Sequence, residues 1–320
     1  MQASKKRGFW VGLGIFFLVL LSPNPESLSP IGWAVAAVTL LMAIWWATEA
    51  VPVAVTALLP LALFPLLQVT DFKAAALPYA NPNIYLFMGG FILALGIESS
   101  GLHKRLALKM LILVGNSGAK LVGGFMLVSA VISMWVMNTS TTLMLLPIGL
   151  AVCASVAETI PNFSAKQRKN FETSLLLGIA YAASIGGMST LVGTAPNIIF
   201  AAFMLETYGI EISFIDWMKL GVPIASIMLV ASWYTITKFV YPVNFVASME
   251  TKLQLRNMLT DLGPLGRDEK KVLVIFLFAA GAWMFRTLLD NFVPLSGLTD
   301  AGIAILAALS FFFIPSENNK

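Results

Sequence analysis

Long apolar segments, separated by short connections that hold most of the charged residues, follow one another along almost the whole chain. Several approach the roughly 20 apolar residues that a helix needs to cross a hydrocarbon core of about 30 Å. We therefore expect an all-α polytopic membrane protein with about eight transmembrane helices and one paired helical region. The expected segments are 8–22, 32–49, 51–68, 83–101, the paired region 121–158, 173–205, 218–241, 272–289 and 299–314.

Composition supports this class. Hydrophobic residues make up 58% of the chain and charged residues 11%, with a mean hydropathy of +0.85. A soluble domain could not hide so much hydrocarbon. The single Cys153 excludes an intrachain disulfide. The net charge of +4 does not indicate a nucleic-acid partner, because the basic residues lie in short clusters between apolar segments.

The basic clusters predict the orientation. With a cytoplasmic N-terminus, most of the 20 basic residues lie on the inner side. Only Lys73, Lys219 and Arg286 remain for the outer side. Lys5–Arg7 precede segment 8–22, and no A-x-A-like cleavage site follows, so this segment reads as a first helix or signal anchor. We expect a multi-pass protein of the cell (plasma or inner) membrane with its N-terminus in the cytoplasm.

Five polar residues, Asn138 to Thr142, interrupt the apolar region 121–158. Basic clusters on both sides are inner, so the chain must return to the side from which it came. Two full helices joined by an external turn satisfy this requirement, and so does a re-entrant hairpin whose tip stops near mid-membrane. The arms 121–137 and 143–157 are short for spanning, which favours the hairpin.

A second interruption lies at 184–197, inside a stretch too long for one straight helix. Gly186, Gly187, Gly193 and Pro196 predict a break near its centre. Oxygens are available there from Ser184, Ser189, Thr190, Thr194 and Asn197. One such segment alone could be close helix packing. Two in succession indicate the midplane site of a transporter.

Both interrupted segments are neutral, since no charged residue lies between Lys120 and Glu158 or between Glu172 and Glu206. Hydroxyl, amide and carbonyl oxygens suit a hard cation such as sodium. Half-helix N-termini suit a carboxylate or another oxyanion. Because an anion alone in an apolar site would be costly, a bound cation is the natural compensation. The site chemistry therefore favours cation-coupled anion transport, although neutral oxygens can also build a channel filter.

Several long motifs, in order, resemble the divalent anion–sodium symporter family, which includes sodium-coupled dicarboxylate and citrate carriers. The resemblance covers nearly the whole chain. It rests on WATEAVPVAVTALLPL (46–61), LFMGGFILALGIESSGLHKRLAL (86–108), SMWVMNTSTTLMLLPI (133–148), ASIGGMSTLVGTAPNIIF (183–200) and GLTDAGIAILAALSFFFIP (297–315).

The resemblance implies roles for particular residues. The family's Ser-Asn-Thr signature matches Met137-Asn138-Thr139 here, at the sodium and substrate carboxylate site. Ser133 matches a further sodium-ligand position, and Gly193 would offer its backbone carbonyl to the same ion. Substrate contacts would come from Asn138, Thr139, Thr194, Pro196 and Asn197. The family also implies sodium as the only cofactor, an elevator-type movement and a homodimer.

Two departures from the family stand out. Met137 replaces the signature serine, and a thioether is a poor ligand for a hard cation, although the Met137 backbone could still serve. The family has two inverted repeats, and we expect this chain to hold the first and only the start of the second. The expected parts are scaffold helices in 1–120, half of a transport domain in 121–241, a cytoplasmic loop in 242–271 and the first two helices of the second repeat in 272–320.

The function expected is sodium-coupled symport of a di- or tricarboxylate such as succinate, malate, fumarate or citrate. A sulfate or other oxyanion carrier and a fragment without independent transport remain alternatives. An enzyme is not expected, because the chain lacks a metal motif or a catalytic pair at membrane depth. His103 reads as an interfacial anchor, Glu49 and Glu98 as helix-end or scaffold contacts, and 104–114 as an amphipathic surface helix.

Overall fold

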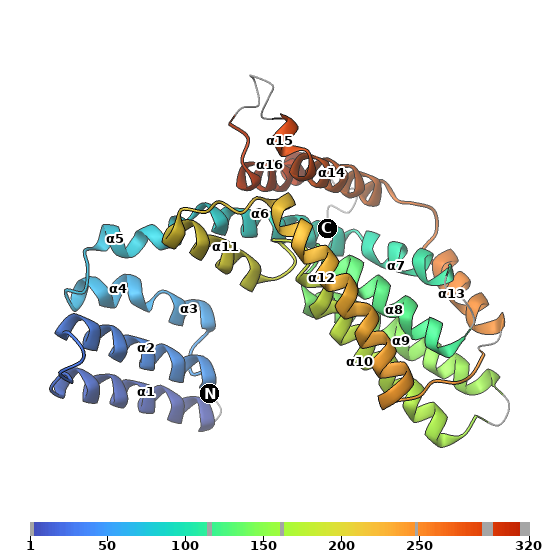
Figure 1. Ribbon diagram of the computed structural model, residues 1–320, viewed down its shortest axis with the longest axis horizontal. Helices are drawn as coiled ribbons and strands as arrows, with labels where there is room; N and C mark the ends of the chain where they lie inside the picture. The colour runs from blue at the N-terminus through green and yellow to red at the C-terminus, as the bar shows by residue number, and fades with distance from the viewer. Residues whose placement is uncertain (1–2, 114–116, 161–162, 247–248, 290–296, 314–320) are drawn as a thin grey trace. The chain divides into compact units, whose positions relative to one another are not determined.

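The computed structural model describes residues 3–113, 117–160, 163–246, 249–289 and 297–313. Within these ranges the regular elements are helices, apart from one isolated bridge between Ser117 and Val246 (Figure 1). The chain forms two compact units, Met1–Asn81 and Pro82–Lys320, which are described separately. The expectation of an all-helical chain is confirmed for the described residues.

The first unit is built on an antiparallel helix pair. Ser29 caps the second of these helices through the N–H of Gly32, and Glu49 ends it in a left-handed conformation. Glu49 also forms an ion pair with Lys5 at 2.9 Å, which confirms its expected role at a helix end. The unit contains α1 (Ala3–Leu21), α2 (Pro30–Thr48), α3 (Val53–Ala57), α4 (Leu59–Leu66), α5 (Phe72–Ala76) and the short 3-10 helix η1 (Leu77–Ala80).

The expected single helix over 51–68 is wrong. The chain forms two short helices there, α3 and α4, which meet at Leu58. Pro60 lies in the first turn of α4 and cannot donate the backbone hydrogen bond that would continue α3. A second proline, Pro65, lies inside α4. The apolar run is therefore continuous in sequence but interrupted in structure.

The second unit holds the paired region, the long broken segment and the helices that follow. Its elements are α6 (Pro82–Ser99), α7 (Leu102–Ile112), α8 (Gly118–Ser133), α9 (Asn138–Thr159), α10 (Ala165–Gly187), α11 (Ala195–Tyr208), α12 (Phe214–Tyr234), the π-helix η2 (Thr235–Val240), α13 (Met249–Asp261), α14 (Arg267–Met284), α15 (Arg286–Leu289) and α16 (Asp300–Phe313). One apolar core joins α7, α8, α9 and α10, and another joins α6, α11, α14 and α16.

Close helix packing in this unit depends on glycine. A Cβ added at Gly186 of α10 would lie 2.2 Å from the carbonyl oxygen of Ala130 in α8. One added at Gly89 of α6 would lie 2.5 Å from the carbonyl carbon of Ala304 in α16. Real side chains do not fit at such distances, so the two backbones meet directly at each point. Small residues serve this purpose in membrane helices.

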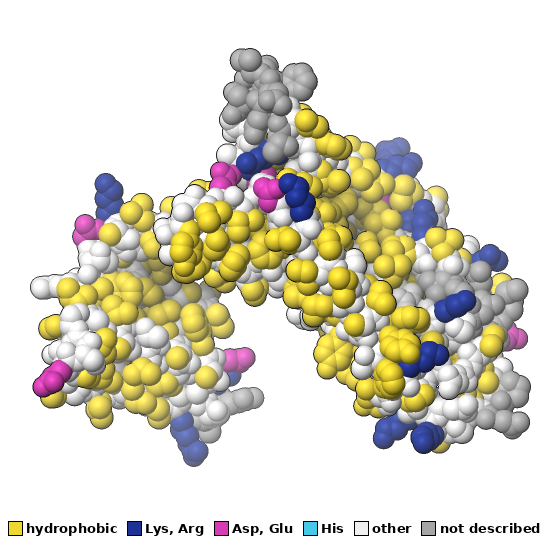
Figure 2. Space-filling model, in the orientation of Figure 1, with side chains coloured by type: hydrophobic (Ala, Val, Ile, Leu, Met, Phe, Trp, Pro, Cys, Tyr) yellow, Lys and Arg dark blue, Asp and Glu magenta, His cyan; other side chains and the backbone are white. Residues whose placement is uncertain are grey.

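Four described helices are long and apolar enough to cross a membrane: Pro30–Thr48, Pro82–Ser99, Asn138–Thr159 and Phe214–Val240. This is fewer than the eight expected. One expected span, 51–68, is divided into two short helices, and others carry charged residues, as α1 and α10 do. The α12–η2 helix is mostly uncovered, with Leu220 and Ile227 each 70% exposed. Hydrophobic side chains lie open over much of the visible face of each unit, as expected of surfaces that face lipid (Figure 2).

The paired region 121–158 forms two helices, as expected, but the turn between them precedes the polar run. Residues 134–137 leave the helical conformation, and Asn138 already belongs to α9. The second arm, with 22 residues, is longer than expected, whereas α8 has 16. The polar residues therefore form the N-terminal turns of a helix and not a connecting loop.

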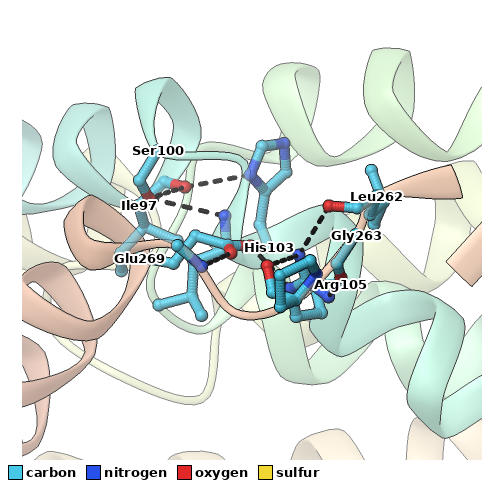
Figure 3. A network of polar contacts seen from close by, with 10 residues as sticks. Ile97, Ser100, His103, Arg105, Leu262, Gly263 and Glu269 are labelled. Atoms are coloured by element: carbon cyan, nitrogen blue, oxygen red, sulfur yellow. Dashed lines mark hydrogen bonds and ion pairs between the residues drawn. The ribbon is translucent and has the colours of Figure 1, made fainter. Parts of the chain in front are cut away.

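The amphipathic surface helix expected at 104–114 is present as α7, but one of its basic residues is buried. Arg105 donates from Nε to Glu269 at 2.7 Å, and both side chains are at most 10% exposed (Figure 3). Its other nitrogens donate to the carbonyl oxygens of Gly263 at 2.8 Å, Leu262 at 3.0 Å and Pro264 at 3.1 Å. Arg105, which the sequence places in a basic cluster, is thus a buried structural residue.

Glu269 completes this network. Its second oxygen accepts a hydrogen bond from the N–H of Gly266 at 2.7 Å, which caps α14. Burial by itself raises the pKa of the Glu269 carboxyl, but the hydrogen bonds from Arg105 and Gly266 outweigh burial and hold that pKa below its ordinary value. His103 is also buried, with 8% exposure. Its expected role as an interfacial anchor stays a prediction.

The segment 242–271, expected as a cytoplasmic loop, contains a helix. Residues Met249–Asp261 form α13, whose Leu255 is 2% exposed and packs into the core beside α7 and α9. The segment carries many charged residues, so its single apolar face was not recognised in the sequence and no helix was predicted. Glu98, at the end of α6, is exposed, as a helix-end residue would be.

We predict that Arg105→Ala destabilises the chain by about 3–5 kcal/mol, because it leaves the Glu269 carboxylate buried without its partner. The measurement is the thermal unfolding midpoint in detergent micelles. Lys5→Ala is the matched control, since it removes a cation from an ion pair that is exposed to solvent. Equal midpoints for the two variants would contradict a structural role for Arg105.

We predict that Gly186→Ala destabilises the chain by about 1–3 kcal/mol, because the added methyl group collides with backbone atoms of α8. Gly281→Ala makes the same change inside α14, where nothing lies within 4 Å of the new Cβ. Since alanine favours helix by up to about 1 kcal/mol over glycine, that control should be neutral or stabilising. Unfolding midpoints of the two variants, compared with the parent chain, decide the point.

Candidate functional site

The first break in helical structure is the turn between α8 and α9. The N–H of Met134 bonds the carbonyl oxygen of Ala130 at 3.1 Å and ends α8, and Met137 is the N-cap of α9. Asn138, Thr139 and Ser140 thus occupy the first turn of α9. In a helix, these first N–H groups have no partner within the helix and carry partial positive charge.

The second break spans residues 188–194 between α10 and α11, where the sequence predicts it. Asn197 closes this break: its Nδ2 donates to the carbonyl oxygens of Gly187 at 2.9 Å and Thr190 at 2.7 Å. The N–H of Gly193 donates to Thr190 Oγ1 at 3.1 Å. From α12, Trp217 Nε1 donates to the carbonyl oxygen of Met188 at 2.9 Å. Side chains thus satisfy backbone groups that the opened helix leaves free.

Two contacts join the breaks to each other. The hydroxyl of Thr190 donates a hydrogen bond to the carbonyl oxygen of Met134, in the turn after α8. A Cβ added at Gly187 would lie 2.4 Å from Asn138 Oδ1, so the side chain of Asn138 rests against the backbone at the end of α10. The two interrupted segments therefore form one site in the second unit.

Neutral oxygens gather where the segments meet. The hydroxyl of Ser133 donates to Asn138 Oδ1 at 2.6 Å, and Ser133 is fully buried. A Cβ at Gly193 would lie 2.4 Å from the carbonyl oxygen of Gly187, which places these two backbones in contact. The hydroxyl hydrogen of Ser133 can rotate, so its oxygen can also face a cation. Hydroxyl, amide and carbonyl oxygens without a net charge are a donor set suited to a hard monovalent cation.

The structure brings together four of the residues that the sequence indicates: Ser133, Asn138, Gly193 and Asn197. The remaining three lie on the helix starts beside this group. Thr139 is exposed in the first turn of α9, Thr194 is the N-cap of α11, and Pro196 is exposed in its first turn. Two helix N-termini are a suitable setting for an anion. Met137, at the serine position of the signature, is 41% exposed.

Sequence reasoning missed the roles of three residues. Gly187 was predicted only as a helix breaker, yet its carbonyl oxygen accepts from Asn197 and its bare Cα admits Asn138. Thr190 links the two breaks, although its hydroxyl gave no signal beyond its polarity. Thr141, one turn into α9, is fully buried and its hydroxyl has no hydrogen-bond partner among the described residues.

The hydrogen bonds of Asn197 go to the protein backbone, whereas the sequence predicted a contact with the substrate. Both of its N–H donations go to backbone carbonyl oxygens of the broken segment, which leaves the side-chain oxygen for other partners. Its geometry makes it a positioning residue for the break. Its part in substrate binding stays a prediction.

Comparison with known proteins also indicates a membrane transporter. The family described as "Sodium:sulfate symporter transmembrane region" matches residues 5–316. A sodium-dependent dicarboxylate transporter, SdcS, of Staphylococcus saprophyticus is 37% identical over 319 residues, which cover 98% of this chain and 61% of the relative. The protein of the same name from Staphylococcus aureus is 37% identical over 323 residues, which cover 100% of this chain and 62% of the relative.

The chain therefore spans about three fifths of the length of the curated relatives that it matches. The match extends over both compact units and includes both helix breaks, so it does not rest on one shared motif. The relatives are transporters and not enzymes, in agreement with the sequence. By this match, the chain belongs to the sodium:sulfate symporter family, the group of divalent anion–sodium symporters whose motifs its sequence carries.

Proposed function

We propose that the chain acts in sodium-coupled symport of di- or tricarboxylate anions such as succinate, malate, fumarate or citrate. The observation that carries this proposal is the neutral oxygen cluster of Ser133, Asn138, Gly187 and Gly193 at the meeting point of two helix breaks. Two relatives that are called sodium-dependent dicarboxylate transporters support the substrate class.

In this proposal, Ser133, Asn138 and the backbone carbonyl of Gly193 hold a sodium ion. The substrate carboxylate binds next to it, on the first turns of α9 and α11, through Asn138, Thr139, Thr194, Pro196 and Asn197. Anion binding depends on bound sodium, because the sodium charge offsets the cost of bringing an anion into a site without Lys or Arg. The coupling of the two ions thus follows from electrostatics.

We further propose the arrangement that the family implies. The scaffold helices lie in 1–120, and half of an elevator-type transport domain lies in 121–241. A cytoplasmic segment 242–271 leads to the start of a second inverted repeat in 272–320. The protein is a homodimer in the cell membrane with its N-terminus inside. It has about eight transmembrane helices and, in addition, a re-entrant hairpin formed by α8 and α9. The 16 residues of α8 support this proposal for its arm.

Two observations support testing other functions as well. The family description names sulfate, so sulfate belongs among the substrates to be tested. The relatives are longer than the chain, so transport by the chain alone has to be measured separately from sodium binding. A sodium-binding fragment without transport is the outcome that would separate the two.

We predict that sodium stabilises the purified chain and that Asn138→Ala abolishes the effect. At a sodium concentration tenfold above its dissociation constant, the stabilisation is about 1.4 kcal/mol relative to the same concentration of choline. The measurement is the thermal unfolding midpoint in sodium and in choline. Sodium-dependent uptake of labelled succinate into proteoliposomes, with sulfate and citrate as competitors, tests transport itself.

Asn257→Ala is the matched control, since Asn257 is exposed in α13, away from both breaks. It should keep the full response to sodium. If sodium stabilised Asn138→Ala as strongly as the parent chain, the proposed cation site would be wrong. If sodium binding held but succinate, citrate and sulfate all failed in uptake, transport by this chain would be wrong and the site would stand.

We predict that Met137→Ser increases the apparent affinity for sodium several-fold. The change places a hydroxyl oxygen at the N-cap of α9, next to Asn138, where a thioether now stands. Sodium titration of the unfolding midpoint measures it. Met228→Ser is the control, because Met228 is 42% exposed in α12, close to the 41% of Met137. An unchanged affinity in Met137→Ser would exclude a side-chain ligand at this position.

A further inference from the structure

A cavity lies beside the turn that precedes Asn138. Its volume is about 190 Å³, and it is bounded by the end of α6, by α7, by the last turn of α8 with the residues that follow it, and by α14. Its apolar lining consists of Ile97, Leu102, Leu106, Met110, Val131, Ile132, Val136 and Phe276. Leu106 and Val131, which are 38% and 37% exposed, mark its open side. A dry apolar cavity of about 150 Å³ is sufficient to bind benzene.

One polar ring lines this cavity, that of His103. Its Nδ1 lies 3.0 Å from the carbonyl oxygen of Ile97, and because a carbonyl only accepts, Nδ1 carries the hydrogen. Burial, the largest influence, lowers the pKa of His103, which favours the neutral ring. Nε2 is then a free acceptor, and it makes no hydrogen bond within the described residues. The ring points away from Arg105 and takes no part in the Arg105 network (Figure 3).

The indole of Trp135 also lines the cavity. Its faces are used: it stacks on Phe214 at 5.8 Å between ring centroids and meets Phe276 edge to face at 4.9 Å. Its Nε1–H, by contrast, makes no hydrogen bond in the described part of the chain, and Trp135 is only partly buried. The two lining residues that carry polar groups, His103 and Trp135, thus bring one free acceptor and one free donor to an otherwise apolar lining.

We propose that this cavity is a second binding site, which takes a small apolar molecule with a hydroxyl group. A hydroxyl is the group that can donate to a neutral imidazole nitrogen and accept from an indole N–H. The apolar remainder of the ligand fills the space between α7 and α8. Trp135 and Val136 belong to the turn before Asn138, so a ligand here rests against the support of the candidate sodium site.

The test uses the whole chain in lipid nanodiscs, with nitrogen-15 in histidine. His103 is the only histidine of the chain, so the ring signals need no assignment. Benzyl alcohol is the probe, and toluene, which lacks the hydroxyl, is its partner. We expect benzyl alcohol to shift the Nε2 signal in a saturable way. Toluene should bind at least about tenfold more weakly, because it can make neither of the two hydrogen bonds of the hydroxyl.

Two variants fill the cavity from different helices, Val131→Phe on α8 and Leu106→Phe on α7, and each should abolish the saturable shift. Val274→Phe is the matched control, because Val274 is 66% exposed on α14 outside the lining, and it should respond as the parent does. A shift that rises linearly with concentration and persists in both filled variants would show partition into lipid only and overturn the proposal. Equal binding of toluene and benzyl alcohol would overturn the role of the hydroxyl. Neither result depends on sodium or on transport, so the proposed function is tested independently.

Discussion

The hydrogen bonds that close the two helix breaks are the constraint on which the rest of the site depends. Backbone carbonyl and N–H groups that lose their helical partners in apolar surroundings cost several kcal/mol each unless something replaces those partners. Asn197 satisfies two carbonyl oxygens of the second break, and Thr190 reaches across to the first. These bonds let the chain stop being helical at two neighbouring points. The oxygens and helix starts of the candidate site are exposed by the same interruption.

The site also requires that the two breaks lie in contact, and glycine residues make this contact possible. At Gly186 and Gly187 the end of α10 approaches α8 and Asn138 more closely than any side chain would permit. A site of neutral oxygens then forms without a charged residue, and in the proposed function a sodium ion supplies the charge that offsets the cost of binding an anion there. The close backbone contact at the glycines thus also accounts for the absence of charged side chains from the site.

Charge in this chain has two uses, which the sequence does not distinguish. Most Lys and Arg residues lie in connections and are consistent with a topology signal. Arg105 belongs to the same cluster by position, but it is buried and holds the 262–266 turn against α7. Burial of a charge is decided by the partner that arrives from a distant segment, here Glu269. Composition within the cluster carries no information about that partner.

The sequence by itself determined the helical class, the position of the second break and the neutrality of the site, because apolar run length, Gly and Pro act locally on the backbone. Only the tertiary structure decided that Asn138 begins a helix, that Ser133 donates to it, and that Gly187 lies against it. It also decided the division of 51–68 into two helices and the formation of α13. These features depend on contacts between residues far apart in the chain, or on the balance between one proline and its packing, and a local pattern does not record either.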